Sequence, residues 1–178
     1  LCGHCEIGNN PGKGEQARPD MIEPTRIGIE SPGVNVAVVK KDPDGWKFLI
    51  LQRAETESYG GYWGFMTGGK QGTETVAQVV VRELREETGL VPQSMWATEY
   101  LVQFYEPEFD KIWILPLIVA VVPADCEVKL SAENGDFRWL PPGKAQRLVT
   151  WKNLERMIEA VTDELDIFPS RNWVQITA

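Results

Sequence analysis

One segment of this chain, Thr75–Thr88, is strongly helical, and no other segment in the first half of the sequence is convincingly so. Thr75 followed three residues later by Gln78 predicts a capping box at the start of the helix. Gly89 predicts a left-handed cap at its end. Because both ends are fixed, the face that each side chain occupies can be read from the sequence.

The end of this helix carries three acidic residues, Glu83, Glu86 and Glu87, where the helix dipole disfavours negative charge. Helical periodicity places Glu83 and Glu87 near the apolar side marked by Val80, with Glu86 on its flank. A carboxylate that faces a core is costly unless a cation neutralises it. Hard divalent ions prefer carboxylate oxygens, so the pattern predicts a metal site. A charged helix end in water is the alternative.

The rest of the chain reads as strands on both sides of this helix, followed by further helix. The predicted strands are Val34–Lys40, Trp46–Arg53, Tyr62–Thr67, Met95–Tyr105, Lys111–Val122, Glu127–Leu130 and Asp136–Leu140. The first two form a hairpin around the turn Asp42–Gly45. Pro141 and Pro142 open a helical stretch, Trp151–Leu165 has amphipathic helical spacing, and the tail from Asp166 is expected to lie over the surface. This order predicts an α/β fold with a mixed β-sheet.

Length and charge limit the classes of function. A chain of 178 residues suits one domain, expected over residues 21–178, with residues 1–20 as a disordered leader or artificial tail. The net charge of -8 disfavours long nucleic acids and anionic membranes. The most apolar run, Ile112–Ala124, is broken by Pro116 and is too short to span a bilayer. We expect a cytoplasmic protein whose substrate is small, with a bound cation if that substrate is anionic.

Cysteine and histidine usage narrows the chemistry. Cys2 and Cys5 flank His4 and could be half a zinc site or a redox pair. The remaining chain offers only Cys126 and no further histidine, and no strand precedes the pair, so both ideas lack support. A histidine-based nucleophilic triad would have no base inside the domain. Acid–base work therefore falls to carboxylates, lysine, tyrosine or metal-bound water.

The stretch Gly68–Leu90, "GGKQGTETVAQVVVRELREETGL", resembles the Nudix box at every defining position. The matching residues are Gly68, Glu74 and the run Arg82-Glu83-Leu84-x-Glu86-Glu87-x-Gly89-Leu90. The wider resemblance covers roughly Gly33–Val161. It implies an α/β/α sandwich that uses Mg²⁺ or Mn²⁺ to hydrolyse a diphosphate linkage in nucleoside diphosphates joined to another group.

The resemblance also implies roles for individual residues. It implies that Glu83 and Glu87 bind the metal and that Glu86 is a further ligand or the general base. It implies that Arg82 orients these acids and forms a salt bridge with Glu74. Main-chain atoms of Thr67 and Gly68 are implied to contact the metal site. One more acid often comes from a later loop, and Glu133 in "SAENGDFRWL" is the candidate here, against an ordinary surface glutamate. Arg53 and Lys70 are the candidates for binding substrate phosphate, although Arg53 could be a plain strand-end charge.

Three short patches, "YWGFMTGG", "AENGDFRWL" and "TWKNLERMIEAV", are similar to the branch that cleaves dihydroneopterin triphosphate. Trp151 and Asn153 in the last patch could line a pocket, although a core position is favoured for Trp151. The pair Gly72-Thr73 departs from the family, which commonly has glycine directly before the box glutamate. A dNTP, a dinucleoside polyphosphate or ADP-ribose remain alternative substrates.

Two alternatives belong to other classes of protein. A non-catalytic Nudix-fold binding module usually loses acids of the box, and this box is intact. A calcium-binding structural domain would need spaced oxygen ligands around a central glycine, which are missing. Family members are often dimers, so the resemblance also implies a homodimer.

Overall fold

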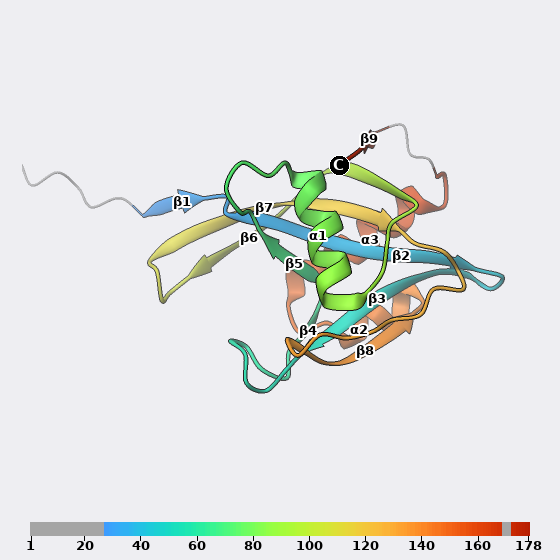
Figure 1. Ribbon diagram of the computed structural model, residues 1–178, viewed down its shortest axis with the longest axis horizontal. Helices are drawn as coiled ribbons and strands as arrows, with labels where there is room; N and C mark the ends of the chain where they lie inside the picture. Colours follow the sequence, from blue (N-terminus) through green and yellow to red (C-terminus); the bar gives the residue numbers. More distant parts are fainter. Residues whose placement is uncertain (1–26, 169–171) are drawn as a thin grey trace, which may run out of the picture.

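The computed structural model describes residues 27–168 and 172–178. Figure 1 shows one β-sheet with α1 on one face and with α2 and α3 on the other. The elements are β1 (Gly28–Glu30), β2 (Gly33–Asp42), β3 (Gly45–Arg53), β4 (Trp63–Gly64), β5 (Met66–Gly69), α1 (Val76–Thr88), β6 (Ser94–Glu106), β7 (Lys111–Val121), β8 (Asn134–Leu140), α2 (Pro142–Leu148), α3 (Lys152–Leu165) and β9 (Val174–Ile176). The predicted α/β class and mixed sheet are confirmed.

The sheet has the order β4-β3-β2-β7-β6-β9, with β1 on β7, β5 on β2 and β8 on β3. The central pair β2–β7 and the short pair β1–β7 are parallel, and the other pairs are antiparallel. Because β2 and β7 are parallel, the chain must cross the sheet between them, and α1 lies on this crossover. The sheet therefore positions α1 directly over β2 and β5.

Alternate residues of β2 pack into two separate cores. Val34, Val36 and Val38 belong to the core beneath α1, while Ala37 and Val39 belong to the core beneath α2 and α3. This alternation is the two-residue period of a strand. Because helices cover both faces, β2 reads as an almost continuous apolar run instead of alternating with polar residues.

The predicted strand Tyr62–Thr67 is interrupted at Phe65. Before this point β4 pairs with β3, and after it β5 pairs with β2. The ring of Phe65 stacks on Phe48 in the core beneath α3, with ring centroids 6.2 Å apart. The break lets one segment change partner strands and brings Gly68 under α1.

The predicted strand Glu127–Leu130 is wrong. The Lys129 N–H donates to the carbonyl of Thr88 at 2.8 Å, and the Ser131 N–H donates to the carbonyl of Glu87 at 2.9 Å. The last carbonyls of a helix have no partner within the helix. This segment supplies partners for them, so it caps α1 instead of joining the sheet.

The sequence predicts that the tail from Asp166 lies over the surface, but part of this tail joins the sheet and the core. Its strand β9 pairs antiparallel with β6, and Trp173 is buried in the core beneath α3, where Phe168 also packs. Cys2, His4 and Cys5 lie outside the described residues. In the part of the chain that is described, no helix is both long and apolar enough to cross a membrane.

The packing of α1 on the sheet predicts a large effect for Leu84→Ala. The side chain of Leu84, in α1, is fully buried in the core between this helix and the sheet. Its truncation leaves a cavity and should lower the free energy of unfolding by about 2–5 kcal/mol. The same change at Leu101, which is 53% exposed, should have a small effect. Urea unfolding of both variants measures the difference, and similar losses would contradict this packing arrangement.

Candidate active site

The ends of α1 are fixed by local hydrogen bonds, as the sequence predicts. The Thr75 hydroxyl accepts from the Gln78 N–H at 3.3 Å, and the Gln78 carboxamide oxygen accepts from the Thr75 N–H at 2.9 Å. Gly89 has a φ of 69°, the left-handed conformation expected of a C-cap. With both ends set, the acidic residues of the last two turns have fixed directions.

Glu87 is the buried member of the acidic group, with 5% of its surface exposed. Its carboxylate accepts a 2.8 Å hydrogen bond from the side-chain amide of Asn134 at the start of β8. The pKa of Glu87 is raised to about 7, mainly by burial and also by the charges of Glu133 and Glu83, while the Asn134 hydrogen bond and the charge of Arg53 act in the opposite direction. A carboxylate in this environment is poised to gain from a cation.

Glu83 packs directly against the backbone of β5. A Cβ placed on Gly68 would overlap the Cγ of Glu83 and would also approach Val79. Only glycine leaves this space free, so the sequence of β5 lets the Glu83 side chain lie against the strand. The structure thereby brings the strand backbone and the acids of α1 together, as the box residues predict.

Arg82 bridges the acids on the outer side of α1. Its guanidinium contacts both carboxylate oxygens of Glu74, at 2.8 and 2.9 Å. It also lies 2.8 Å from Glu83 and 3.2 Å from Glu86. Bonding to Arg82, together with the Gln71 N–H, lowers the pKa of Glu74 to about 2. The predicted Arg82–Glu74 salt bridge is confirmed, and the single guanidinium of Arg82 contacts three carboxylates.

Two residues from other elements approach the buried end of α1. Arg53 at the end of β3 and Glu133 in the loop before β8 both lie near enough to influence Glu87 electrostatically. The Ala54 N–H donates to the Glu133 carbonyl at 2.9 Å, which ties the two loops together. The guanidinium of Arg53 is held by the carbonyl of Ser58, with the Nε 3.0 Å away. The fold thus gathers Glu83, Glu87, Glu133 and Arg53.

The side chains of Lys70 and Thr67 do not join the group around Glu87. Lys70 is exposed and influences Glu74, at the N-terminal side of the box, and it is not among the charges near Glu87. Thr67 is paired with Asn35 of β2, so its side chain is on the sheet face opposite α1. Only its main chain can therefore serve the acidic cluster. Asn134, which orients Glu87, was not anticipated, although it directly follows Glu133.

The donor set fits a hard divalent cation. Glu83, Glu86 and Glu87 offer carboxylate oxygens, one of them buried, beside a glycine backbone that leaves room for close approach. Within residues 27–168 and 172–178, no three acidic, histidine or cysteine side chains are already arranged around one point. Arg82 accounts for this, because it draws Glu83 and Glu86 toward its own positive charge.

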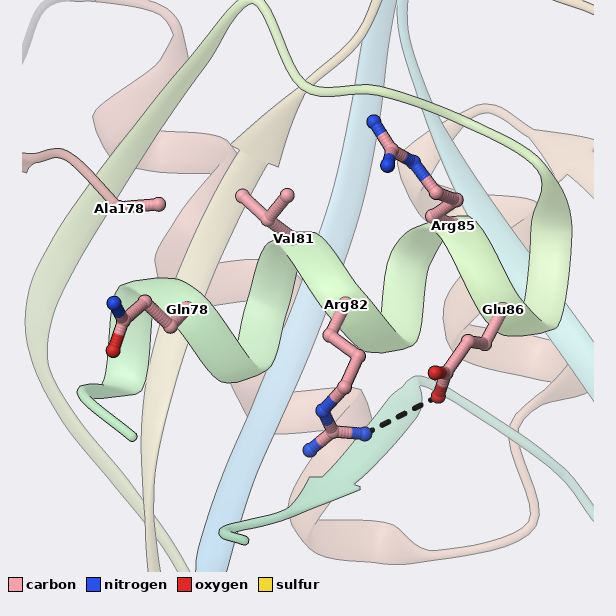
Figure 2. Close-up of a pocket in the computed structure, with 6 residues that line it drawn as sticks. All are labelled: Gln78, Val81, Arg82, Arg85, Glu86 and Ala178. Atoms are coloured by element: carbon pink, nitrogen blue, oxygen red, sulfur yellow. Dashed lines mark hydrogen bonds and ion pairs between the residues drawn. The ribbon is translucent and has the colours of Figure 1, made fainter. Parts of the chain in front are cut away.

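A shallow hollow of about 330 Å³ lies beside this cluster on the outer side of α1. Figure 2 shows Arg82 and Glu86 joined on one side of the helix and Arg85 on the other, with Ala178 opposite Val81. The hollow shares Arg82 and Glu86 with the acidic cluster and does not include the buried Glu87. Of the acids in the cluster, only Glu86 lines this hollow.

Comparison with known proteins decides the family. The NUDIX domain model matches residues 31–161. The chain belongs to the Nudix family. Its domain is that of the Nudix hydrolases, a class that acts on phosphoanhydride bonds. The recognised box and the α/β fold are therefore confirmed.

The curated relatives that match this chain have different names. An octanoyltransferase of Myxococcus xanthus is 30% identical over 131 residues, which cover 72% of this chain and 36% of that protein. The chain thus spans about a third of that relative's length. The nucleoside triphosphatase NudI of Escherichia coli is 26% identical over 106 residues, covering 56% of this chain and 75% of that protein.

Solved structures share the fold. The Ap4A hydrolase of C. elegans superimposes with a TM-score of 0.66 at 17% identity, over 76% of this chain and 98% of that one. The dihydroneopterin triphosphate pyrophosphohydrolase of E. coli gives a TM-score of 0.59 at 19% identity, over 76% and 99%. At such identities the likeness shows the fold alone.

The burial of Glu87 predicts how the stability of the metal-free protein depends on pH. The pKa of Glu87 is about 7 in the folded protein and 4.5 as a model value, so between these pH values the folded state keeps a proton that the unfolded state loses. Stability should therefore fall as the pH rises from 4.5 to 7, by up to about 3 kcal/mol from this group.

Glu87→Gln should remove this loss, because glutamine stays neutral. In EDTA the variant should unfold at a higher temperature than wild type above pH 7 and at about the same temperature below pH 4.5. The same change at the exposed Glu159 of α3 is the control and should not alter the pH dependence. If the melting temperatures of wild type and Glu87→Gln depended on pH in the same way, the raised pKa of the buried Glu87 carboxyl would be contradicted.

Proposed function

We propose that this protein is a divalent-cation-dependent Nudix pyrophosphohydrolase that cleaves a diphosphate bond in a nucleoside triphosphate-like substrate. The observation that carries the proposal is the burial of Glu87 within a group that includes Glu83, Glu133 and Arg53. A buried acid surrounded mainly by acids is unfavourable for folding alone, so its cost needs a functional reason. Binding a cation, and through it a phosphate, supplies that reason.

Glu83, Glu86, Glu87 and the main-chain carbonyl of Thr67 are the groups that would hold Mg²⁺ or Mn²⁺. When bound, such an ion neutralises phosphate charge and activates water. Arg82 acts as a positioning residue, because its ion pairs fix the directions of Glu83 and Glu86. Asn134 does the same for Glu87 through its hydrogen bond.

Other charged residues of the chain bind the substrate phosphates and accept a proton. Arg53 and Lys70 bind and orient the phosphate groups. One of Glu86, Glu83 and Glu133 accepts the proton of the attacking water as its oxygen bonds to phosphorus. The bridging P–O bond then breaks, and its electron pair leaves with the departing phosphate.

Dihydroneopterin triphosphate and a dNTP are the substrates we favour. The Thr67-Gly68 pair and the patch around Asn153 support the first of these, and the likeness to a nucleoside triphosphatase supports the second. Dinucleoside polyphosphates and ADP-ribose are the alternatives within the same chemistry. A non-catalytic nucleotide-binding module is the alternative of another class.

A substrate panel with Mg²⁺ tests the proposal. It should include dihydroneopterin triphosphate, the dNTPs, ADP-ribose and diadenosine polyphosphates, with phosphate or pyrophosphate release as the readout. One substrate class should be cleaved well, and Glu87→Gln should lower kcat/KM for it at least about 100-fold. Nucleotide binding without turnover of any substrate would favour the binding module instead.

The packing of Glu83 on β5 gives a second test with a matched control. Gly68→Ala should displace Glu83 and lower activity about 100-fold, because a shift of about 1 Å in a catalytic group has effects of this size. Gly69→Ala should retain most of the activity, since a Cβ at Gly69 would meet nothing within 4 Å. Equal activity of the two variants would contradict the role given to Glu83.

A further inference from the structure

The loop formed by residues 54–61, between β3 and β4, begins beside the acidic cluster. Arg53, the last residue of β3, pairs in register with Asn134 of β8, and the Asn134 amide donates to the buried Glu87 at 2.8 Å. The charge of Arg53 also acts on Glu87. Whatever fixes the direction of the Arg53 side chain therefore matters for the space next to these carboxylates.

The loop itself fixes the Arg53 side chain. The Nε of Arg53 donates to the carbonyl of Ser58 at 3.0 Å, and its Nη2 lies 3.6 Å from a carboxylate oxygen of Glu57. Main-chain bonds close the base of the loop, because the Arg53 N–H donates to the Tyr62 carbonyl and the Gly61 N–H donates to the Arg53 carbonyl, both at 2.9 Å. The direction of the guanidinium thus depends on the orientation of the Ser58 carbonyl.

Tyr59 sets the orientation of the Ser58 carbonyl. Its φ of 61° lies in the left-handed region, which a tyrosine rarely adopts because its Cβ crowds the backbone. The φ angle is the rotation between the Cα of Tyr59 and the peptide group that carries the Ser58 carbonyl. A return of Tyr59 to a negative φ would therefore turn this carbonyl, which is the acceptor for Arg53. Such a strained conformation persists only when surrounding contacts hold it.

Contacts outside the loop hold Tyr59 in this conformation. Its hydroxyl donates to a carboxylate oxygen of Glu106, at the end of β6, at 2.7 Å. Its ring meets those of Tyr62 and Trp151, with centroids 5.9 and 5.6 Å apart. Trp151 is 46% exposed, contrary to the core position favoured from the sequence, so its ring lies at the surface where this loop contacts it.

Glu106 is a firm anchor for the Tyr59 hydroxyl. Only 8% of its surface is exposed, so its carboxylate depends on donors within the protein. Its other oxygen accepts from the Glu108 N–H at 3.5 Å, which makes the bond from Tyr59 the shorter of the two. In the sheet, β2 and β7 lie between β3 and β6. The bond therefore ties the loop after β3 to a strand that is not its neighbour.

We propose that Tyr59 is a positioning residue for Arg53, and that its hydrogen bond to Glu106 holds the Arg53 guanidinium in the direction from which it binds a substrate phosphate. Without this bond Tyr59 relaxes to a negative φ, the Ser58 carbonyl turns, and Arg53 loses its acceptor. A guanidinium that is fixed in advance loses less freedom on binding, so its release weakens phosphate binding. This inference rests on the proposed function, which assigns Arg53 to the substrate phosphates.

The test is the affinity of the full chain for methylenediphosphonate in the presence of Mg²⁺, measured by calorimetry. This probe resembles a diphosphate, but its carbon bridge cannot be hydrolysed. Tyr59→Phe keeps the ring and removes the hydroxyl, and it should weaken binding about tenfold. Tyr105→Phe is the matched control, because it removes a 2.8 Å tyrosine–carboxylate bond to Asp110 beside the same end of β6. It should leave the affinity unchanged.

A double-mutant cycle separates the positioning of Arg53 from a general loss of structure. In Arg53→Ala there is no guanidinium to position, so adding Tyr59→Phe should change the affinity by less than about twofold. A merely structural role of Tyr59 would weaken binding by the same factor in both backgrounds. Equal factors, or an undiminished affinity in Tyr59→Phe alone, would overturn the inference.

Glu106 offers a conservative variant. Glu106→Gln keeps a carbonyl oxygen that accepts from the Tyr59 hydroxyl, so its affinity should stay within about twofold of that of wild type. Glu106→Leu removes the acceptor and should lower the affinity as much as Tyr59→Phe does, with thermal melts to check that both variants are folded. Equal losses in the two variants would overturn the role of this hydrogen bond. The cycle of Tyr59 and Arg53 decides the inference even if Glu106→Leu does not fold.

The experiment separates this inference from the proposed function. Binding of the diphosphonate involves no hydrolysis, so binding that depends on Tyr59 through Arg53, in a protein that cleaves none of the panel substrates, would overturn only the hydrolase proposal. Cleavage of a panel substrate by a protein that does not bind the diphosphonate, or binds it independently of Tyr59, would overturn only the inference about Tyr59.

Discussion

The burial of one carboxylate, that of Glu87, is the constraint on which the rest of the site depends. Its side chain accepts from Asn134, while its main-chain carbonyl accepts from Ser131. The end of α1, the segment before β8 and β8 itself therefore meet at a single residue. Any rearrangement that exposed Glu87 would also uncap α1 and detach this segment, so the acidic end of the helix is held by the fold as a whole.

Positive charge is scarce around the acids, and this scarcity suits the chemistry. Among the described residues, Arg82 alone forms ion pairs with Glu74, Glu83 and Glu86, and Arg53 is the cation that lowers the pKa of Glu87. With too few cations to balance it, the cluster favours an added divalent ion. A chain with a net charge of -8 can then attract an anionic phosphate at this one place, although its overall field repels polyanions.

The sequence predicted best what depends on local chemistry. The bounds of α1 and the Arg82–Glu74 pair follow from residues close in the chain, and the structure has them as expected. The segment 127–130 has strand composition, but its N–H groups serve helix carbonyls distant in sequence. Asn134 was missed for the same reason, because a lone asparagine acquires meaning only through its partners in space.

The two-residue period of β2 and β5 separates two tasks within a few residues. Side chains on one face meet α1 and the carboxylates, and those on the other face belong to the core beneath α2 and α3. Substitutions on the α3 face leave Glu83 and Gly68 unaltered, because neighbouring residues in a strand point in opposite directions.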